Sequence, residues 1–131
     1  MASAGFVLRT LVPTSSIYDL SYPNSSAFTS KQYLFVYDNG TALTVAGSNQ
    51  ATIGVMQDST DGSTRPTVST VRTVGLTKLV LGADVSPMAY VRSDANGAAV
   101  TCVTGEFAEA YVMDGGLSGE QVAAMIIHCK V

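Results

Sequence analysis

The hydrophobic residues of this chain fall into short runs that turn residues interrupt roughly every ten positions, and this pattern predicts strands. Val and Thr are frequent within the runs, and β-branched side chains favour a pleated strand over a helix. The spacing is typical of an all-β fold with little helix, a small antiparallel β-sandwich or barrel. We expect strands at residues 6–12, 32–37, 42–46, 52–57, 67–74, 77–81, 89–92, 98–103, 108–113 and 121–128.

Two polar segments between these runs predict hairpin turns. Residues 38–40 end in Asn-Gly, and residues 94–97 end in the same pair. Asn and Gly tolerate the positive φ angles that a tight type I′ turn requires at both central positions. Residues 13–30 differ, because they are polar, contain two prolines and read as an extended loop that nevertheless carries aromatic rings.

The chain also repeats itself. When it is shifted by 57 positions, residues 33–62 lie over residues 90–119 without a gap, and nine of the thirty pairs are identical. Average protein composition would give about two. The sequence therefore predicts one domain, residues 1–131, built from two pseudo-repeated strand-hairpin units at about residues 6–68 and 69–131. The identical pairs are Tyr33/Tyr90, Asn39/Asn96, Gly40/Gly97, Ala42/Ala99, Thr44/Thr101, Ala51/Ala108, Val55/Val112, Met56/Met113 and Gly62/Gly119.

The C-terminal stretch supports two interpretations. Ser118 and Gln121 have the spacing of a helix capping box in front of an apolar run. The repeat instead aligns this run with residues 65–71, whose alternating Thr and Val predict a strand. We expect a strand at residues 121–128, with a short helix as the alternative.

Charge excludes several classes of partner. Charged residues make up 13% of the chain, the net charge is −3, and no run of Lys and Arg is present, so direct nucleic-acid binding is not expected. No apolar segment is long enough to cross a bilayer, so no membrane association is expected. The start, Met1 to Arg9, lacks the positive n-region of a signal peptide, so no signal peptide is expected.

Residues that could carry out chemistry are few. His128 is the single histidine, and alternation along a strand puts it on the opposite face from Cys129. Cys102 and Cys129 are expected to be free thiols, and they lack the clustered partners of a metal site. Glu106 and Glu109 flank Phe107 in an expected turn next to Gly105, so they are interpreted as residues of a solvated loop and not as a tuned acid–base pair. The sequence therefore predicts no catalytic, metal or cofactor site, and a protein that is not an enzyme.

The second copy resembles the small head decoration (capsid cement) proteins of tailed bacteriophages. The similarity lies in MAYVRSDANGAAV at residues 88–100, AYVM at 110–113 and LSGEQV at 117–122. It implies a β-rich protein without an active site that binds the outer surface of the expanded capsid and bridges major capsid subunits. It also implies a homo-oligomer, a trimer or a dimer, located on the outside of the virion. The missing signal peptide agrees with assembly in the host cytoplasm.

For the contacts with the capsid we expect the N-terminal arm and the 13–30 segment to be used. Their aromatic side chains Phe6, Tyr18, Tyr22 and Phe28 are the candidate anchors, because aromatic rings often dominate interface energy. Two other functions fit the composition. One is a different virion component, a tail or head fibre, and the other is a carbohydrate- or receptor-binding β module.

Overall fold

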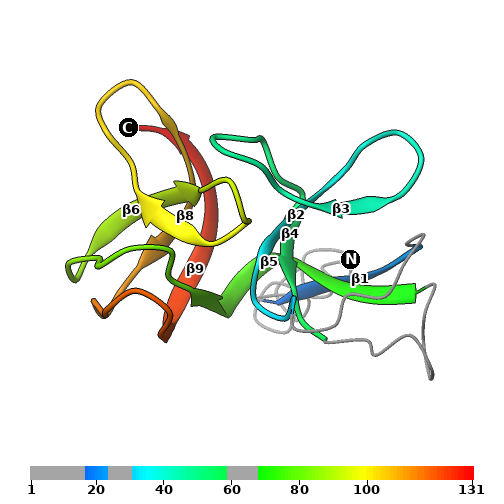
Figure 1. The fold of residues 1–131 in the computed structure, drawn as a ribbon. Helices are drawn as coiled ribbons and strands as arrows, with labels where there is room; N and C mark the ends of the chain where they lie inside the picture. Colours follow the sequence, from blue (N-terminus) through cyan, green and yellow to red (C-terminus); the bar gives the residue numbers. More distant parts are fainter. Residues whose placement is uncertain (1–16, 24–30, 59–67) are drawn as a thin grey trace, which may run out of the picture.

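The computed structural model describes residues 17–23, 31–58 and 68–131. Nine strands form one continuous antiparallel sheet, and the described residues contain no helix, so the predicted all-β fold is confirmed (Figure 1). The strands are β1 (Tyr18–Pro23), β2 (Phe35–Asp38), β3 (Leu43–Val45), β4 (Gly54–Met56), β5 (Val68–Val80), β6 (Ala89–Ser93), β7 (Ala99–Thr101), β8 (Phe107–Val112) and β9 (Gln121–Lys130).

The long strand β5 belongs to both halves of the molecule. Its first part pairs with β1 and β4, and its last part pairs with β9. The sheet order β3-β2-β4-β5-β9-β8-β6-β7 therefore has the same arrangement on either side of the β5–β9 pair, with a hairpin at each outer edge. Figure 1 shows the result as two curled lobes that β5 connects. We call the lobe before Gly75 the first unit and the lobe after it the second unit.

Strand β5 corrects the predicted break between residues 74 and 77. One strand replaces the two that the sequence predicts, because Gly75 bends the chain at φ 105° and Leu76 then pairs with Met125. A glycine can adopt this φ at little cost, so the backbone turns from one unit into the other without leaving the sheet.

Strand β1 corrects the predicted extended loop. Residues 18–23 pair antiparallel with β5, with Leu20 opposite Val71. Asp19 on β1 also accepts two hydrogen bonds from the Arg72 guanidinium, at 2.8 and 3.1 Å. The strand forms because β5 offers an unpaired edge, which the local sequence does not reveal. The strand predicted at residues 6–12 lies outside the described residues.

Both predicted hairpin turns occur, but the predicted type I′ geometry is wrong. Gly40 and Gly97 have positive φ angles of 94° and 80°, whereas the Asn that precedes each glycine does not. The loops are longer than two residues, and polar side chains accept hydrogen bonds from their backbone amides. In the first loop, Asn39 Oδ1 accepts from the amides of Thr41 and Ala42, each at 2.9 Å.

The C-terminal stretch is a strand, so the strand prediction is confirmed and the helix alternative is wrong. Side chains along β9 alternate between exposed and buried from Gln121 to Ile126, which is the period of a strand. Ser118 does not cap a helix, because its amide donates to Asp84 Oδ1 at 2.9 Å.

A shared core and backbone hydrogen bonds hold the two units together. Phe35 and Val55 of the first unit belong to the same buried cluster as the interior of the second unit. The Phe35 amide donates to the Gly97 carbonyl at 2.8 Å, and the Val80 amide donates to the Tyr33 carbonyl at 3.1 Å. Buried backbone groups that are paired in this way fix the orientation of the two lobes.

Candidate functional site

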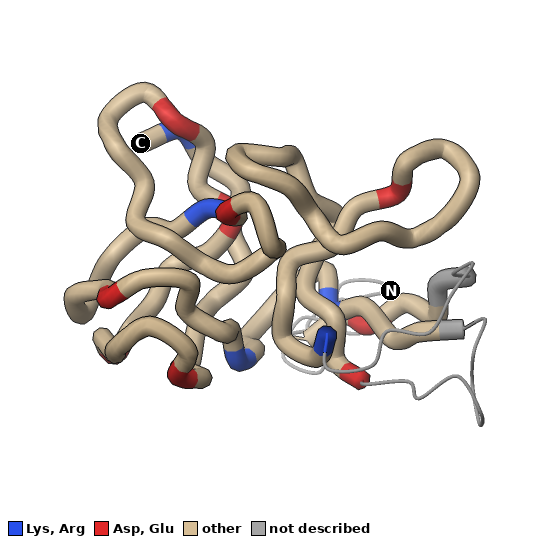
Figure 2. The backbone as a smooth tube through the Cα atoms, in the orientation of Figure 1, with Lys and Arg blue, Asp and Glu red and all other residues tan. Residues whose placement is uncertain are grey.

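Charged residues are sparse and are spaced singly along the described backbone (Figure 2). Two arginines are engaged in ion pairs, Arg72 with Asp19 at 2.8 Å and Arg92 with Glu106 at 3.0 Å. Along the described backbone, Lys and Arg therefore form no run of positive charge that would attract a polyanion. Its apolar features are the better candidates for contact with a partner.

A row of apolar side chains crosses the outer face of the second unit. Tyr90 lies opposite Tyr111, Tyr111 lies opposite Met125, and Met125 lies opposite Leu76. Directly opposed residues in an antiparallel sheet share one face, so these four side chains form a continuous row over four strands. Tyr90, Leu76 and Met125 are exposed and Tyr111 is half-buried, so this outer apolar row faces solvent.

The outer apolar row ends in an apolar groove beside the first unit. The groove has a volume of about 430 Å³ and is lined by Ile17, Val74, Gly75, Leu76, Met125 and Ile126. Val74 and Leu76 are about half-exposed, and they flank the bend at Gly75. The bend that joins the units therefore also creates this groove. Contiguous exposed apolar surface of this kind is typical of an interaction site.

Of the four predicted anchors, the structure describes the side chain of Tyr18. It is 55% exposed and lies opposite Val74 at the end of the groove. The backbone of Tyr22 lies in β1 opposite Ser69, and its side chain is outside the described structure. Phe6 and Phe28 lie outside the described residues, so their roles stay predictions.

Sequence reasoning missed the residues that accompany Tyr18. Leu76 falls in the predicted break between two strands, and Met125 falls in a predicted strand with no surface role assigned to it. The signal is in β9 itself, where Val122, Ala124 and Ile126 are buried while Met125 between them is apolar and exposed. A strand with apolar residues on both faces indicates that its outer face also serves as a contact.

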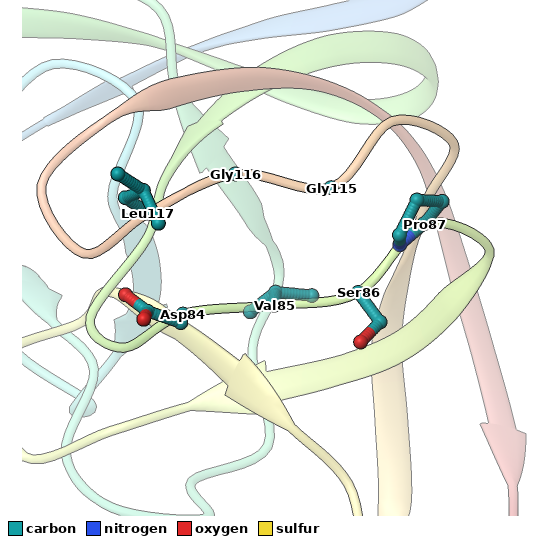
Figure 3. Close-up of a pocket in the computed structure, with 7 residues that line it drawn as sticks. All are labelled: Asp84, Val85, Ser86, Pro87, Gly115, Gly116 and Leu117. Carbon is teal, nitrogen blue, oxygen red and sulfur yellow. The ribbon is translucent and has the colours of Figure 1, made fainter.

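A second depression lies where two loops of the second unit meet (Figure 3). It has a volume of about 350 Å³ and is lined by residues 84–87 and 115–117. The amide and carbonyl of Val85 bond with those of Gly116 in both directions at 2.9 Å, so the loops are fixed to each other. A side chain at Gly115 would lie 2.5 Å from the Val85 carbonyl oxygen, so the close approach of the two loops requires glycine there.

This loop depression offers a rigid surface and little chemistry. Figure 3 shows Asp84 and Leu117 toward one end of the depression, with Ser86 and Pro87 toward the other. Asp84 is the one ionisable side chain of its lining, and its carboxylate already accepts the Ser118 amide. Leu117 is 62% exposed. The depression therefore suits an apolar contact better than catalysis.

A third pocket, which we call the junction pocket, lies between the two units. It has a volume of about 370 Å³ and includes Thr52 from the first unit and Phe107, Glu109 and His128 from the second. Glu109 is buried and accepts hydrogen bonds from the Thr52 amide and hydroxyl, at 2.7 and 2.6 Å. The lone histidine is half-exposed at this pocket, where its Nδ1 lies 3.4 Å from Glu109 Oε2.

The thiols add no reactive group to this arrangement. Cys102 and Cys129 are both free, as the sequence predicts. Burial raises the pKa of the Cys102 thiol to about 11, and the nearby Glu106 carboxylate adds to the effect. A thiol with a raised pKa is a weak nucleophile at neutral pH. Across the described part of the chain, no three His, Cys, Asp or Glu side chains come close enough to hold a metal ion.

The aromatic pair on the outer face lacks the coplanar rings of a sugar-binding platform. Tyr90 and Tyr111 have ring centroids 5.1 Å apart, but the rings are inclined by 60°. A coplanar pair would favour the carbohydrate-binding alternative, whereas this tilted arrangement is that of an ordinary packed aromatic pair.

The described residues also contain no helix that is long and apolar enough to cross a membrane.

Comparisons with known proteins place the fold. No known family model matches the chain, and no curated protein matches it in sequence. Among solved structures, the chain is similar to the N base of the head fibre protein gp8.5 of bacteriophage phi29, with a TM-score of 0.63. The two chains are 14% identical, and the match covers 88% of this chain and 98% of the other. The two proteins therefore share the arrangement of their strands over nearly the whole of that base.

Proposed function

We propose that this chain is a structural component of a bacteriophage virion that attaches to the head as a decoration protein. In this role it binds the outer surface of the expanded capsid and bridges major capsid subunits. The observation that carries the proposal is the structural match to 98% of a head fibre base. The resemblance of residues 80–127 to decoration proteins points to the same part of the virion by a separate route.

The described surface supports a bridging role because its apolar features lie apart from one another. The outer apolar row and its groove lie over β5, β6, β8 and β9, whereas the loop depression lies at residues 84–87 and 115–117. Both belong to one block that a shared core holds together. Several modest contacts on a rigid block favour avidity, since the second contact forms at a high effective concentration.

Self-association would increase that avidity. In the proposed arrangement, two or three copies of this chain attach together to neighbouring capsid subunits, and the outer apolar row is a candidate contact between copies. Its exposed side chains Tyr90, Leu76 and Met125 are of the types that homo-oligomer interfaces enrich at their centres.

The base of a head fibre is a second candidate function, and the structural match itself favours it. A fibre base anchors a projecting shaft, whereas a decoration protein reinforces the shell. The two roles differ in one measurable property, the stability of the head. Heads that carry a decoration protein should resist heating better than heads without it, whereas a fibre base should leave the melting temperature of the shell unchanged.

The proposed function is tested by co-sedimentation of the purified chain with heads of its own phage. We expect binding to mature, expanded heads and little binding to unexpanded heads, because the subunits to be bridged change their spacing on expansion. Failure to bind either form would contradict the proposal.

The contact surface is tested with variants in the same experiment. The double substitution Leu76→Ser and Met125→Ser removes the two side chains of the outer apolar row that also line the groove. It should reduce occupancy about tenfold or more, as loss of an interface hot spot does. Val103→Ser is the matched control, because Val103 is also exposed (64%) but lies outside both the row and the groove.

The predicted aromatic anchors are tested by the double variant Tyr18→Ala and Tyr22→Ala. Reduced head occupancy with an unchanged melting temperature would support their role. Undiminished occupancy would exclude these two tyrosines as anchors and would leave the outer apolar row as the candidate contact.

A further inference from the structure

The junction pocket contains a buried carboxylate that is only half used. Glu109 has a side chain that is 7% exposed, on a strand whose outer face the first unit covers at this point. Both hydrogen bonds from Thr52 go to Oε1. Oε2 has one polar contact among the described residues, the His128 ring at 3.4 Å, which is longer than an ordinary N–H···O bond. An ionised carboxylate can accept about four hydrogen bonds, so Oε2 has free acceptor capacity.

The backbone holds this carboxylate in place. β8 and β9 change register between Ala108 and Ala110, and this irregularity leaves Glu109 facing His128. On the other side, Asn49 has a positive φ of 54° and its amide donates to the Ser93 carbonyl at 2.9 Å. That bond fixes the segment that carries Thr52 against the second unit. The pocket is therefore present before any ligand arrives, which lowers the entropic cost of binding.

The wall of the pocket is aromatic. Phe107 lines it, and its ring is 62% exposed and so is accessible to a ligand. A cation that sits against an aromatic face and donates to a carboxylate gains from both interactions. The volume, about 370 Å³, is at the low end of the range for small-molecule sites and admits one long side chain.

His128 is the nearest potential cation, but its Nδ1 lies 3.4 Å from Glu109 Oε2, so its contact with the carboxylate is long and leaves room for a closer external donor. Arg92 is paired with Glu106 and with the Ser93 carbonyl. Lys130 lies opposite Phe107 in the sheet, and it is exposed to solvent. A buried carboxylate is most stable when a cation pairs with it directly.

The geometry points to the junction pocket as a binding site for the cationic side chain of a lysine or arginine on a partner protein. Glu109 Oε2 accepts hydrogen bonds from the ammonium or guanidinium group, and the ring of Phe107 covers its apolar stem. Arginine fits better than lysine, because its planar group can donate to the carboxylate while it stacks on the ring. The assignment of that side chain to a capsid subunit rests on the proposed function, whereas the chemistry of the pocket does not.

The test uses the full chain labelled with ¹⁵N and the probe N-acetylarginine amide. Addition of the probe should shift the amide resonances of Thr52, Phe107 and Glu109 and saturate them at a common dissociation constant. The uncharged isostere N-acetylcitrulline amide should not produce these shifts. Equal effects of the two probes, or no shifts at the pocket, would overturn the assignment.

Variants then distinguish the effect of the Glu109 charge on binding from any effect on folding. Glu109→Gln keeps an oxygen for Thr52 and removes the charge, so binding of the probe should weaken about tenfold to hundredfold. Phe107→Ala changes an exposed ring and should also weaken binding while the melting temperature stays unchanged. Asp84→Asn is the matched control, because this carboxylate also accepts a backbone amide but lies in the loop depression.

The outcomes distinguish this inference from the proposed function. Unchanged affinity in both Glu109→Gln and Phe107→Ala would overturn the inference, whatever the chain does with phage heads. A chain that binds the arginine probe at the pocket but binds no heads would contradict the proposed function and would leave the pocket assignment in place.

Discussion

Gly40 and Gly97 show how one residue type serves two purposes at equivalent positions of the repeat. Both glycines have positive φ angles, 94° and 80°, in the hairpin loops of the two units. Around Gly40 nothing lies within 4 Å of the position that a Cβ would take. At Gly97 that position is 2.5 Å from Val45 Cγ1 and 3.1 Å from the Phe35 carbonyl oxygen. Glycine at position 97 therefore allows both the positive φ of the turn and the close approach of the two units.

The first prediction compares alanine substitutions at these two glycines. Gly40→Ala should cost about 1–2 kcal/mol, because it adds only backbone strain. Gly97→Ala should cost about 2–5 kcal/mol, because it adds the same strain and also overpacks the contact between the units. The measurement is the free energy of unfolding in urea. Equal losses would show that the contact at Gly97 can relax and that the two units are not tightly joined.

Glu106 makes the hairpin between β7 and β8 sensitive to acid. Its carboxylate accepts from the Val103 amide at 2.8 Å and from Arg92 Nε at 3.0 Å. The hydrogen bond from Val103, and after it the Arg92 guanidinium, hold the pKa of Glu106 below its ordinary value. A carboxylate with a depressed pKa in the folded state contributes stability that is complete above its ordinary pKa. That stability is lost as the pH falls through the lower folded value.

The second prediction follows from the lowered pKa of Glu106. On acidification below the ordinary carboxylate range, the Val103 amide should lose its hydrogen bond, and its protection from exchange should fall. The measurement is the protection factor of the Val103 amide, which is its exchange rate relative to that of an unstructured peptide at the same pH, between neutral and acidic pH. The Glu106→Gln variant should show the faster exchange of its Val103 amide already at neutral pH. If the protection of the Val103 amide depends on pH in the same way in Glu106→Gln and in the unchanged protein, a group other than Glu106 causes the effect.

At the scale of the elements, β5 is the central feature of the architecture. It pairs with β1 and β4 before Gly75 and with β9 after it. β1, by contrast, pairs with β5 alone in the described structure, and the Asp19–Arg72 ion pair ties it there. The hydrogen bond and charge of Asp19 raise the pKa of Arg72, so the guanidinium stays charged.

The third prediction concerns this attachment. Asp19→Asn should destabilise β1 by at most about 1 kcal/mol, because exposed ion pairs contribute little. Amides of β1 should exchange several-fold faster in the variant, whereas amides of β9 should be unchanged. High salt should reduce the difference between the two proteins, since it screens the pair. A uniform increase in exchange over the whole sheet would show that β1 and the core unfold as one unit.

Periodicity and turn residues predict most of the elements. Seven strands, β2 to β4 and β6 to β9, occur within a few residues of their expected places, because each has a clear apolar run between turn signals. β1 was missed because its pairing depends on a distant edge of β5 and not on its own polar sequence. The join within β5 was missed because Gly75 reads locally as a break.

The candidate surfaces were less predictable than the strands. Tyr18 could be singled out as an aromatic residue in a polar segment, and it is exposed at the groove. Met125 and Leu76 lie side by side in the outer apolar row only because β5 and β9 pair in a particular register. Glu109 reads as a solvated turn residue in the sequence, and the first unit buries it through Thr52. Contacts between the units are long-range, so the sequence pattern does not reveal them.

At the scale of the whole molecule, two similar units form one block with a common core. The block has few charges, an exposed apolar face and a charged pocket at the junction of its units. These properties suit a protein that works by attachment, since binding costs least when the contact surfaces are rigid and in place beforehand. The chain shares this fold with the base of a head fibre protein, and attachment to a phage head is the function that we propose for it.

The most direct test of this account is electron cryo-microscopy of mature phage particles with and without this chain. The account predicts a two-lobed density on the outside of the head, at the junctions of capsid subunits, that is absent from particles lacking the protein. Density confined to the tail, or identical head reconstructions in the two preparations, would contradict it.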